Sequence, residues 1–290
     1  MPKATAGAGA NIAFIKYWGH ADPALNIPLN DSISMTLDNA CTVTTVEFSP
    51  DLAADALCLN DQCAEPGASA RASAQLDRLR RLAGVRLYAR IASRNTFPVA
   101  AGIASSAAGF AALTVAGAAA LGLDLPARDL SRLARLASGS ACRSLFGGYV
   151  LWHAGTDDAN SYAGQLAPET YWPLVDIVAI VSRAAKDVPS EAGHRLASTS
   201  PLLPGRLAAL PAALAACRAA IEHRDFAALG QVAEADALSL HAIAMTSQPA
   251  LLYWEPATLA LMHAIRGWRK AGLPVYFTID AGPNVHVLTI

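Results

Sequence analysis

Four segments of this chain concentrate side chains that could bind or transform a phosphorylated ligand. The first ends an apolar stretch, where Lys16 is followed by Tyr17-Trp-Gly-His20. An ammonium buried without a partner is costly, so this lysine requires a counter-charge, a bound phosphate or a route to solvent. The residue types leave a ligand-binding lysine and a surface-reaching lysine equally open.

The second segment, residues 97–109, reads Phe-Pro-Val-Ala-Ala-Gly-Ile-Ala-Ser-Ser-Ala-Ala-Gly and continues into an apolar helical pattern. Small residues let a backbone approach a ligand closely, and a helix begins with N–H groups that lack intrahelical acceptors. This combination is typical of a phosphate-binding loop. The same composition also suits a helix start that packs tightly against a neighbour.

The third and fourth segments place a cation and an acid next to turns. Arg143 lies in Ser138-Gly-Ser-Ala-Cys-Arg-Ser144, where it either grips a carboxylate or phosphate or belongs to a helix cap with a surface ion pair. Asp280 ends an apolar stretch before Ala281-Gly-Pro-Asn284. An acid in that position either caps the turn or serves as a positioned base.

The composition indicates a compact globular protein. The 290 residues are 53% hydrophobic and 16% charged, which suffices for two domains. A net charge of −1 provides no basic surface for nucleic acid or an anionic membrane. The five cysteines show neither a disulfide framework nor metal-ligand spacing. Without a signal-peptide pattern or a convincing membrane span, we expect a cytoplasmic protein.

The elements that must position the four segments follow from hydrophobic periodicity. We expect strands at 11–16, 32–37, 41–48, 85–91, 148–152, 174–181, 274–280 and 285–290, the run at 174–181 being of the buried type. We expect helices at 69–83, from the glycine loop to 121, and at 127–137, 203–222, 225–245 and 255–271. Groups of strands mixed with groups of helices predict an α+β fold. A composition shift near 153–173 divides it into domains at 1–172 and 173–290.

In their order along the chain, these segments closely resemble the mevalonate diphosphate decarboxylase family of the GHMP kinase superfamily. The resemblance rests on residues 11–19, 30–34, 98–107, 138–144 and 280–284, and it spans nearly the whole chain. It implies a two-domain GHMP kinase fold with the active site in the interdomain cleft, and it allows the last strand to return to the N-terminal, ATP-binding domain. It also implies a homodimer that acts in the mevalonate and isoprenoid pathway.

The resemblance assigns catalytic roles to three residues. It implies that Asp280 is the base or orienting group at a tertiary hydroxyl, that Lys16 balances its charge, and that Arg143 grips the substrate carboxylate. Ser138 and Ser140 would contact the substrate beside Arg143. The reaction would use ATP and Mg²⁺, release ADP, phosphate and CO₂, and leave an isopentenyl product.

The nucleotide would lie against the glycine loop. The resemblance implies that Ser105 or Ser106 points at the γ-phosphate or at the Mg²⁺ carried by ATP, and that Ser93 and Asn95 help to bind the nucleotide. The residues implied to cradle the ATP phosphates are Ala100, Ala101, Gly102, Ala104, Ser105, Ser106 and Ala107.

Two departures from the family concern the far end of the substrate, where Tyr17 would also contact a phosphate. His20 stands where the family has lysine, and Glu191 falls where bacterial members carry an arginine. Because both changes remove positive charge from the terminal phosphates, we expect the substrate to be mevalonate 5-phosphate and the product isopentenyl phosphate. The alternative is the same reaction on mevalonate 5-diphosphate, in which other cations, such as Lys186, Arg183, His194 or Arg195, would bind the diphosphate. A second alternative is a small-molecule kinase that does not decarboxylate.

Overall fold

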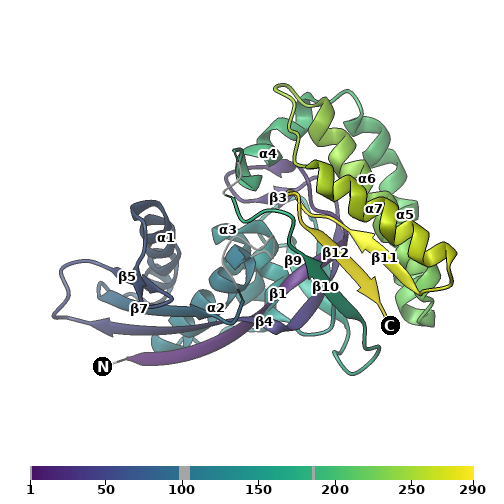
Figure 1. Ribbon diagram of the computed structural model, residues 1–290. Helices are drawn as coiled ribbons and strands as arrows, with labels where there is room; N and C mark the ends of the chain where they lie inside the picture. The colour runs from purple at the N-terminus through teal and green to yellow at the C-terminus, as the bar shows by residue number, and fades with distance from the viewer. Residues whose placement is uncertain (1, 98–104, 185–186) are drawn as a thin grey trace.

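The computed structural model describes residues 2–97, 105–184 and 187–290 (Figure 1). Four residues of the predicted phosphate cradle, Ala100, Ala101, Gly102 and Ala104, lie outside these ranges. Two main sheets and their covering helices confirm the α+β prediction. In the described ranges, no single helix is long and apolar enough to cross a membrane, although the bent pair Ser190–Thr199 and Leu203–His223 meets the criteria by length and composition alone.

A seven-stranded sheet forms the first half of the molecule, in the order β6-β5-β7-β4-β8-β9 with β1 paired to β4. Its strands are β1 (Lys3–Ile15), β4 (Ser32–Ser49), β5 (Ala56–Leu59), β6 (Gln62–Cys63), β7 (Tyr88–Asn95), β8 (Tyr149–His153) and β9 (Tyr162–Ala167). The single long strand β4 takes the place of the two strands predicted at 32–37 and 41–48. Its first residues pair with β8 and its later ones with β7, while β1 accompanies it along most of its length. The polar residues Asp38 and Asn39 therefore lie within a strand and do not form a turn.

Three helices cover one face of this sheet (Figure 1). They are α1 (Pro66–Ala83), α2 (Ser105–Ala120) and α3 (Ala127–Ala137), and α3 leads into the 3₁₀ helix η1 (Gly139–Leu145). The alanine-rich α2 packs closely against α1, because a Cβ at Gly117 would lie 2.7 Å from the Leu79 side chain. Such close packing holds the first residues of α2, Ser105 and Ser106, beside the end of α3.

A three-stranded sheet in the order β10-β12-β11 forms the second half, with β10 at Val175–Ala179, β11 at Val275–Thr278 and β12 at Val285–Thr289. Its helices are α4 (Ser190–Leu196), the 3₁₀ helix η2 (Ala197–Thr199), α5 (Leu203–His223), α6 (Phe226–Thr246) and α7 (Pro256–Lys270). The last strand, β12, pairs with β10 and β11 and does not return to the large sheet. It stays there because its apolar side chains Val285 and Val287 pack beneath α7.

The prediction of a buried strand at 174–181 is wrong. Strand β10 forms an edge of the small sheet, where Val175 and Ile177 are 50% and 55% exposed. Continuous apolar runs are typical of buried strands, but an edge position leaves one side of the strand uncovered. Only the side chain of Asp176, between these two residues, is deeply buried.

A shared hydrophobic core joins the two halves and carries the end of β1 into the interior. Ile12 and Phe14 of β1 contact a cluster that includes Leu229 of α6 and Tyr276 of β11. Strand β1 ends at Ile15, so the next residue, Lys16, lies where the two halves of the molecule meet. The hairpin of β2 (His20–Asp22) and β3 (Ile27–Pro28) follows immediately.

Candidate active site

A cleft of about 650 Å³ lies between the two halves of the molecule. Both halves line it, and it brings together residues that are far apart in the sequence. The predicted residues that line it are Lys16, Tyr17, His20, Ser105, Ser106, Ser138, Ser140, Arg143, Glu191 and Asp280. The four segments singled out by their residue types therefore meet in one place.

Lys16 and Asp280 form an ion pair in this cleft. The Lys16 Nζ lies 2.6 Å from Asp280 Oδ1 and also donates to the Ala13 carbonyl at 2.7 Å. Lys16 is 1% exposed, whereas the Asp280 side chain is 32% exposed and accessible to a ligand. Burial opposes ionisation of Asp280, but Lys16 above all outweighs it, and the pKa of Asp280 lies below its usual range.

The backbone of Lys16 is fixed by a second, deeper ion pair. Asp236 of α6 accepts the Lys16 backbone N–H at 2.6 Å, and it also pairs with Arg206 of α5 at 2.9 Å. Arg206 donates in turn to the Lys16 carbonyl at 3.2 Å, and the Asn30 amide donates to the same carbonyl at 3.1 Å. The two side chains of this pair are 2% and 4% exposed, so the strand end that carries Lys16 is held rigidly.

Arg143 is held by Asn11 of β1 and by Ser32 at the start of β4. Its Nε and Nη2 donate to Asn11 Oδ1 at 3.1 and 3.0 Å, and its Nη1 donates to Ser32 Oγ at 2.5 Å. A guanidinium has five N–H bonds; these contacts use three of them, so two can face a bound carboxylate. Burial lowers the pKa of Arg143, which an anionic ligand would counteract.

The predicted serines surround Arg143 on η1 and the neighbouring helix ends. Ser138 Oγ lies 3.5 Å from Ser106 Oγ at the start of α2, so substrate and nucleotide segments are adjacent. The Ser140 carbonyl accepts from the Asn11 amide at 3.3 Å. Between them, a Cβ on Gly139 would lie 2.7 Å from the Tyr17 ring, so only glycine fits there.

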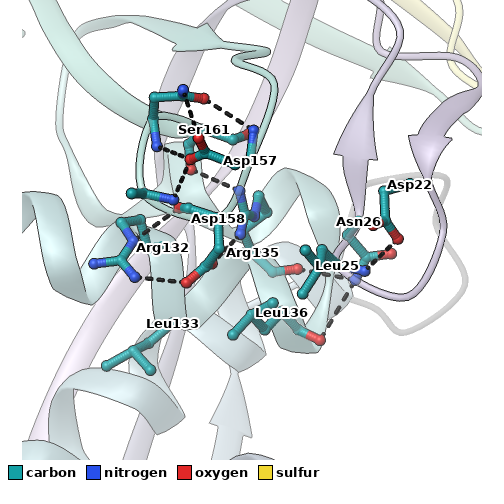
Figure 2. Close-up of polar contacts among 12 residues, drawn as sticks. Asp22, Leu25, Asn26, Arg132, Leu133, Arg135, Leu136, Asp157, Asp158 and Ser161 are labelled. Carbon is teal, nitrogen blue, oxygen red and sulfur yellow. Dashed lines mark hydrogen bonds and ion pairs between the residues drawn. The ribbon is translucent and has the colours of Figure 1, made fainter.

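A polar network around the end of α3 anchors the β2–β3 hairpin and the loop at 157–161 (Figure 2). The buried Arg135 binds Asp158 and donates to the Ser161 carbonyl. On the other side of the helix end, Asn26 of the hairpin donates to the Arg135 and Leu136 carbonyls at 3.0 and 3.4 Å. The network thus fixes the hairpin, which lines the cleft, to the end of α3.

Three rings, Tyr17, His20 and His194, form a cluster at one end of the cleft. The Tyr17 and His194 ring centroids are 4.0 Å apart, and the Tyr17 hydroxyl is hydrogen-bonded to His20. His194 Nδ1 accepts the Gly19 N–H at 3.0 Å, which leaves its proton on Nε2. Burial lowers the pKa of both imidazoles, aided by Arg195 at His20 and by His20 itself at His194. Both rings are therefore neutral near pH 7.

Glu191 lines the same end of the cleft, but its charge is compensated. It pairs with Arg195 one turn along α4 at 2.7 Å, with both side chains largely exposed. The repulsion that the sequence predicts between Glu191 and a terminal phosphate is reduced by this adjacent cation.

Only some of the residues predicted to bind the nucleotide lie in the cleft. Ser105 and Ser106 line the cleft, and Ala107 is buried behind them. Ser93 and Asn95 do not line it, since their side chains bond Thr44 and Thr42 on the neighbouring strand at 2.9 and 2.6 Å. Their proposed contact with nucleotide stays a prediction.

Among the described residues, no cluster of three or more His, Cys, Asp or Glu side chains could hold a metal ion. The hydroxyls of Ser105 and Ser106 line the cleft at the start of α2 and could each supply one oxygen ligand. Mg²⁺ commonly takes one or two protein oxygens together with nucleotide phosphates and water. These residues fit a Mg²⁺ that arrives with ATP.

Sequence reasoning missed the residues that position the predicted ones. Asn11 opens the first motif, and an amide within an apolar strand is a signal that it has a buried polar partner. Arg206 and Asp236 lie on helices whose apolar pattern predicted only packing. His194 was expected only as one of several cations that could bind a diphosphate, and its stacking on Tyr17, 177 positions away in the sequence, was not predicted.

Two family models match the chain. The diphosphomevalonate decarboxylase-like N-terminal domain matches residues 8–163, and the mevalonate 5-diphosphate decarboxylase C-terminal domain matches residues 176–290. Among curated proteins, the diphosphomevalonate decarboxylase of Aspergillus fumigatus is 42% identical and that of Ganoderma lucidum 39%. The alignments cover 97% and 99% of this chain and 75% and 78% of the two relatives.

Solved structures agree with these matches. The mevalonate diphosphate decarboxylase of Staphylococcus aureus superposes with a TM-score of 0.95 at 41% identity, over 99% of this chain and 87% of that one. A structure of MDDEF in complex with MVAPP, AMPPCP and magnesium superposes with a TM-score of 0.94 at 40% identity, over 99% and 88%. The predicted two-domain GHMP kinase fold is thereby confirmed.

Proposed function

The chain belongs to the diphosphomevalonate decarboxylase family, and from this membership we propose that it converts mevalonate 5-diphosphate to isopentenyl diphosphate with consumption of ATP. The observation that carries the proposal is the meeting of Asp280, Lys16 and Arg143 in one cleft. An acid paired with a cation, facing a guanidinium with free donors, suits a substrate that carries both a hydroxyl and a carboxylate.

Each of these residues has a task in the reaction. Asp280 Oδ1 or its partner oxygen accepts the proton of the tertiary hydroxyl, or orients that hydroxyl towards the γ-phosphate. Lys16 keeps Asp280 ionised, as the lowered pKa of the carboxyl indicates. Arg143 holds the substrate carboxylate through the N–H bonds that Asn11 and Ser32 leave free. Positioning and electrostatics supply most of the catalysis in phosphoryl transfer.

The chemistry balances without a further reactant. The hydroxyl oxygen takes the γ-phosphoryl group of ATP, which turns a poor leaving group into a good one. The C–O bond then breaks and phosphate leaves with its electron pair. The bond to the carboxylate breaks next, its electrons form the alkene, and CO₂ departs. The cofactors are ATP and Mg²⁺, and Mg²⁺ neutralises phosphate charge when bound.

For the substrate, the relatives favour the diphosphate over the monophosphate expected from the sequence. The relatives are named diphosphomevalonate decarboxylases, and one solved structure contains MVAPP. The Glu191–Arg195 pair supports the same choice, since it offsets the repulsion on which the monophosphate expectation depended. The neutral His20 and His194 still offer donors to a phosphate without adding charge. The kinase without decarboxylation has no support from the relatives.

The test is a turnover assay of the purified chain with ATP and Mg²⁺, on each of the two phosphorylated mevalonates. We expect CO₂ and ADP in equal amounts and a higher kcat/KM for the 5-diphosphate. A higher kcat/KM for the 5-monophosphate would reverse the substrate assignment. ADP without CO₂ would identify a kinase. Localisation in the cytoplasm and assembly as a homodimer stay predictions.

A further inference from the structure

Two cysteines face each other across the β5–β6 hairpin, at the edge of the seven-stranded sheet. Cys58 of β5 lies directly opposite Cys63 of β6, and both are free thiols in the structure. The number and spacing of the cysteines predict no disulfide framework, yet the strand register brings these two together. Neither residue lines the cleft, so the pair lies outside the proposed mechanism.

The turn of the hairpin fixes this register. Asn60 and Asp61 have φ angles of 48° and 64°, the left-handed conformation that both central residues adopt in the tight two-residue turns of hairpins. The Asn60 N–H donates to the Ser93 carbonyl at 2.9 Å, and its Oδ1 accepts the Asn95 N–H at 2.9 Å. The turn is therefore held against the end of β7 and does not slip.

The hydrogen bonds of the hairpin place the two cysteines at a position that a disulfide can span. The Ala64 N–H donates to the Leu57 carbonyl at 3.0 Å. Hydrogen-bonded and non-hydrogen-bonded pairs alternate along antiparallel strands, so the neighbouring Cys58–Cys63 pair is of the second kind. The Cα atoms of such pairs are about 4.5 Å apart, and disulfides join Cα atoms about 4.4–6.8 Å apart.

Both thiols are accessible from the open face of the sheet. Leu57 packs into the core beneath α1, so the side chains of Cys58 and Cys63 point to the opposite face. Cys63 is exposed and Cys58 is half-buried. A small reagent in solution therefore meets Cys63 first, and Cys58 lies beside it to complete the reaction.

The other three cysteines occupy different surroundings. Cys142 and Cys217 are buried. Cys41 is half-buried on β4, where Gly9 of β1 stands opposite and the thiol donates to the Asp38 carbonyl at 3.0 Å. Cys41 is therefore a thiol of similar exposure to Cys58 but without a cysteine across the strand pair, which makes it an internal control.

We propose that Cys58 and Cys63 are a redox modification site that forms a reversible disulfide by exchange with a small-molecule disulfide such as oxidised glutathione. The Cys63 sulfur attacks the glutathione disulfide, and one glutathione leaves. Cys58 then attacks the Cys63 sulfur of the mixed disulfide and releases the second glutathione. Two S–H bonds are replaced by one S–S bond, and the two electrons and two protons pass to the two glutathione molecules.

The disulfide would secure the weakest edge of the large sheet. Strand β6 has only two residues and pairs with β5 alone. A cross-link between the two strands limits local opening of the hairpin, and the turn that it closes contacts β7 through Asn60. In a reducing compartment such a bond is transient, as is typical of redox-sensing cysteines.

The experiment equilibrates the full-length chain with mixtures of reduced and oxidised glutathione and then blocks free thiols with N-ethylmaleimide. The chain is denatured and cut before aspartate residues. Cleavage before Asp61 separates Cys58, in fragment 55–60, from Cys63, in fragment 61–76, so a disulfide is the one remaining covalent link between them. We expect a linked pair, two hydrogen atoms lighter than the sum of its parts, which dithiothreitol separates.

Two variants and one control test the order of the steps. Cys58→Ser should stop at the mixed disulfide and accumulate glutathione on Cys63, whereas Cys63→Ser should react more slowly because the remaining thiol is half-buried. Cys41→Ser should form the linked pair as the wild type does. In the oxidised wild type, amide hydrogen exchange over residues 56–64 should slow by about threefold or more, and Cys58→Ser should show no such change.

The proposal is overturned if the two fragments stay separate throughout the glutathione series. It is also overturned if Cys41 is linked in their place, if the link joins two copies of the chain, or if Cys58→Ser gains no glutathione at Cys63. Should either serine variant fail to fold, the fragment linkage in the wild type still decides. Release of CO₂ tests the proposed function separately, since neither thiol lies in the cleft.

Discussion

A single ammonium decides the ionisation of the acid at the centre of this site. Burial alone would raise the pKa of Asp280, yet contact with Lys16 at 2.6 Å brings it below the usual range. The residue that donates this charge is itself almost fully buried. The pair therefore depends on both partners, and each is a sensitive point for mutation.

The first prediction concerns Lys16→Met. Removal of the cation leaves burial as the main influence on Asp280, so the pKa of the carboxyl rises and the acid limb of the kcat–pH profile moves to higher pH. The profile is measured by release of labelled CO₂. Lys3→Met, which breaks only the surface pair with Glu47, is the matched control and should not move the limb. An unmoved limb in Lys16→Met would refute the electrostatic role.

The second prediction concerns Asp280→Asn, which keeps the shape of the side chain but cannot accept a proton. We expect kcat to fall by about 10²–10⁴-fold, the usual contribution of a positioned base or acid. AMPPCP affinity should stay near that of the wild type, because Asp280 is assigned to the other substrate. Single-turnover rates and titration calorimetry check the two halves of this prediction, and a loss of only a few-fold would contradict it.

The third prediction concerns Asn11→Ala, which removes the acceptor for two N–H bonds of Arg143. A hydrogen bond to a buried charge contributes about 1.5–3 kcal/mol, so the free energy of unfolding should drop by about that amount. KM for the phosphorylated mevalonate should rise, since Arg143 loses its orientation. Ser34→Ala is the control: its buried hydroxyl has no partner among the described residues, and its removal should cost little.

At the scale of elements, two helices hold the end of β1, where Lys16 directly follows the strand. The Arg206–Asp236 pair links α5 and α6 and bonds both the N–H and the carbonyl of Lys16. Hydrophobic periodicity predicts α5 and α6 only as packing helices. In the structure they also supply the polar contact that fixes the backbone of Lys16. Such a contact is invisible in a pattern of hydrophobic residues, because each helix supplies a single charged residue.

The fourth prediction is that Arg206→Met destabilises the protein by about 3–5 kcal/mol, because it leaves Asp236 charged and unpaired in the interior. The double change Arg206→Met with Asp236→Leu should recover part of this loss. Urea unfolding measures both. If the double variant is no more stable than the single one, the cost does not arise from an uncompensated charge.

Much of the fold was predictable from the sequence, and the errors have physical causes. Helix α3 was predicted with its observed bounds, Ala127–Ala137, since Pro126 and Ser138 mark its ends. Strands were predicted at 32–37 and 41–48, whereas β4 runs unbroken through Asp38 and Asn39, at the point where its register with β1 shifts between Gly9 and Asn11. Strand β10 looked buried because periodicity cannot show where a strand stands in its sheet.

The residues of the site were likewise predictable only in part. Lys16, Arg143 and Asp280 were predictable because their residue types stand out from apolar or small-residue surroundings. Asn11, Arg206 and His194 act through contacts across more than a hundred residues, which no local pattern records. Arg195 was expected as one of the cations that could bind a diphosphate, but its pairing with Glu191 became clear only once α4 placed the two side chains together.

At the scale of the whole molecule, a further buried pair joins the edge strand β10 of the small sheet to its central strand β12. His286 of β12 lies 2.8 Å from Asp176 of β10, and both side chains are 2% exposed. Burial disfavours the charged imidazole, but Asp176 and then Asp280 outweigh it, so the pKa of His286 is raised. The stability of the molecule is thereby coupled to pH through the strand that follows Asp280.

The fifth prediction follows from the sign of that shift. A raised pKa in the folded state stabilises the protein fully below the pKa of unfolded histidine, about 6.5, and the contribution is lost as the pH rises through the folded pKa. The wild type should therefore lose unfolding free energy relative to His286→Gln as the pH increases from about 6 upward. Urea unfolding over a pH series tests this. His263→Gln, on the exposed side of α7, should show no such trend.

The Lys16–Asp280 contact joins positions 264 residues apart, near the two ends of the chain. During synthesis, the lysine leaves the ribosome long before the aspartate exists, so a nascent chain has the cation of the site without its acid. Closure of so long a loop comes late in folding, after local helices have formed. Decarboxylation should therefore be the last property gained on refolding, and its onset can serve as a reporter that the whole chain has reached its native state.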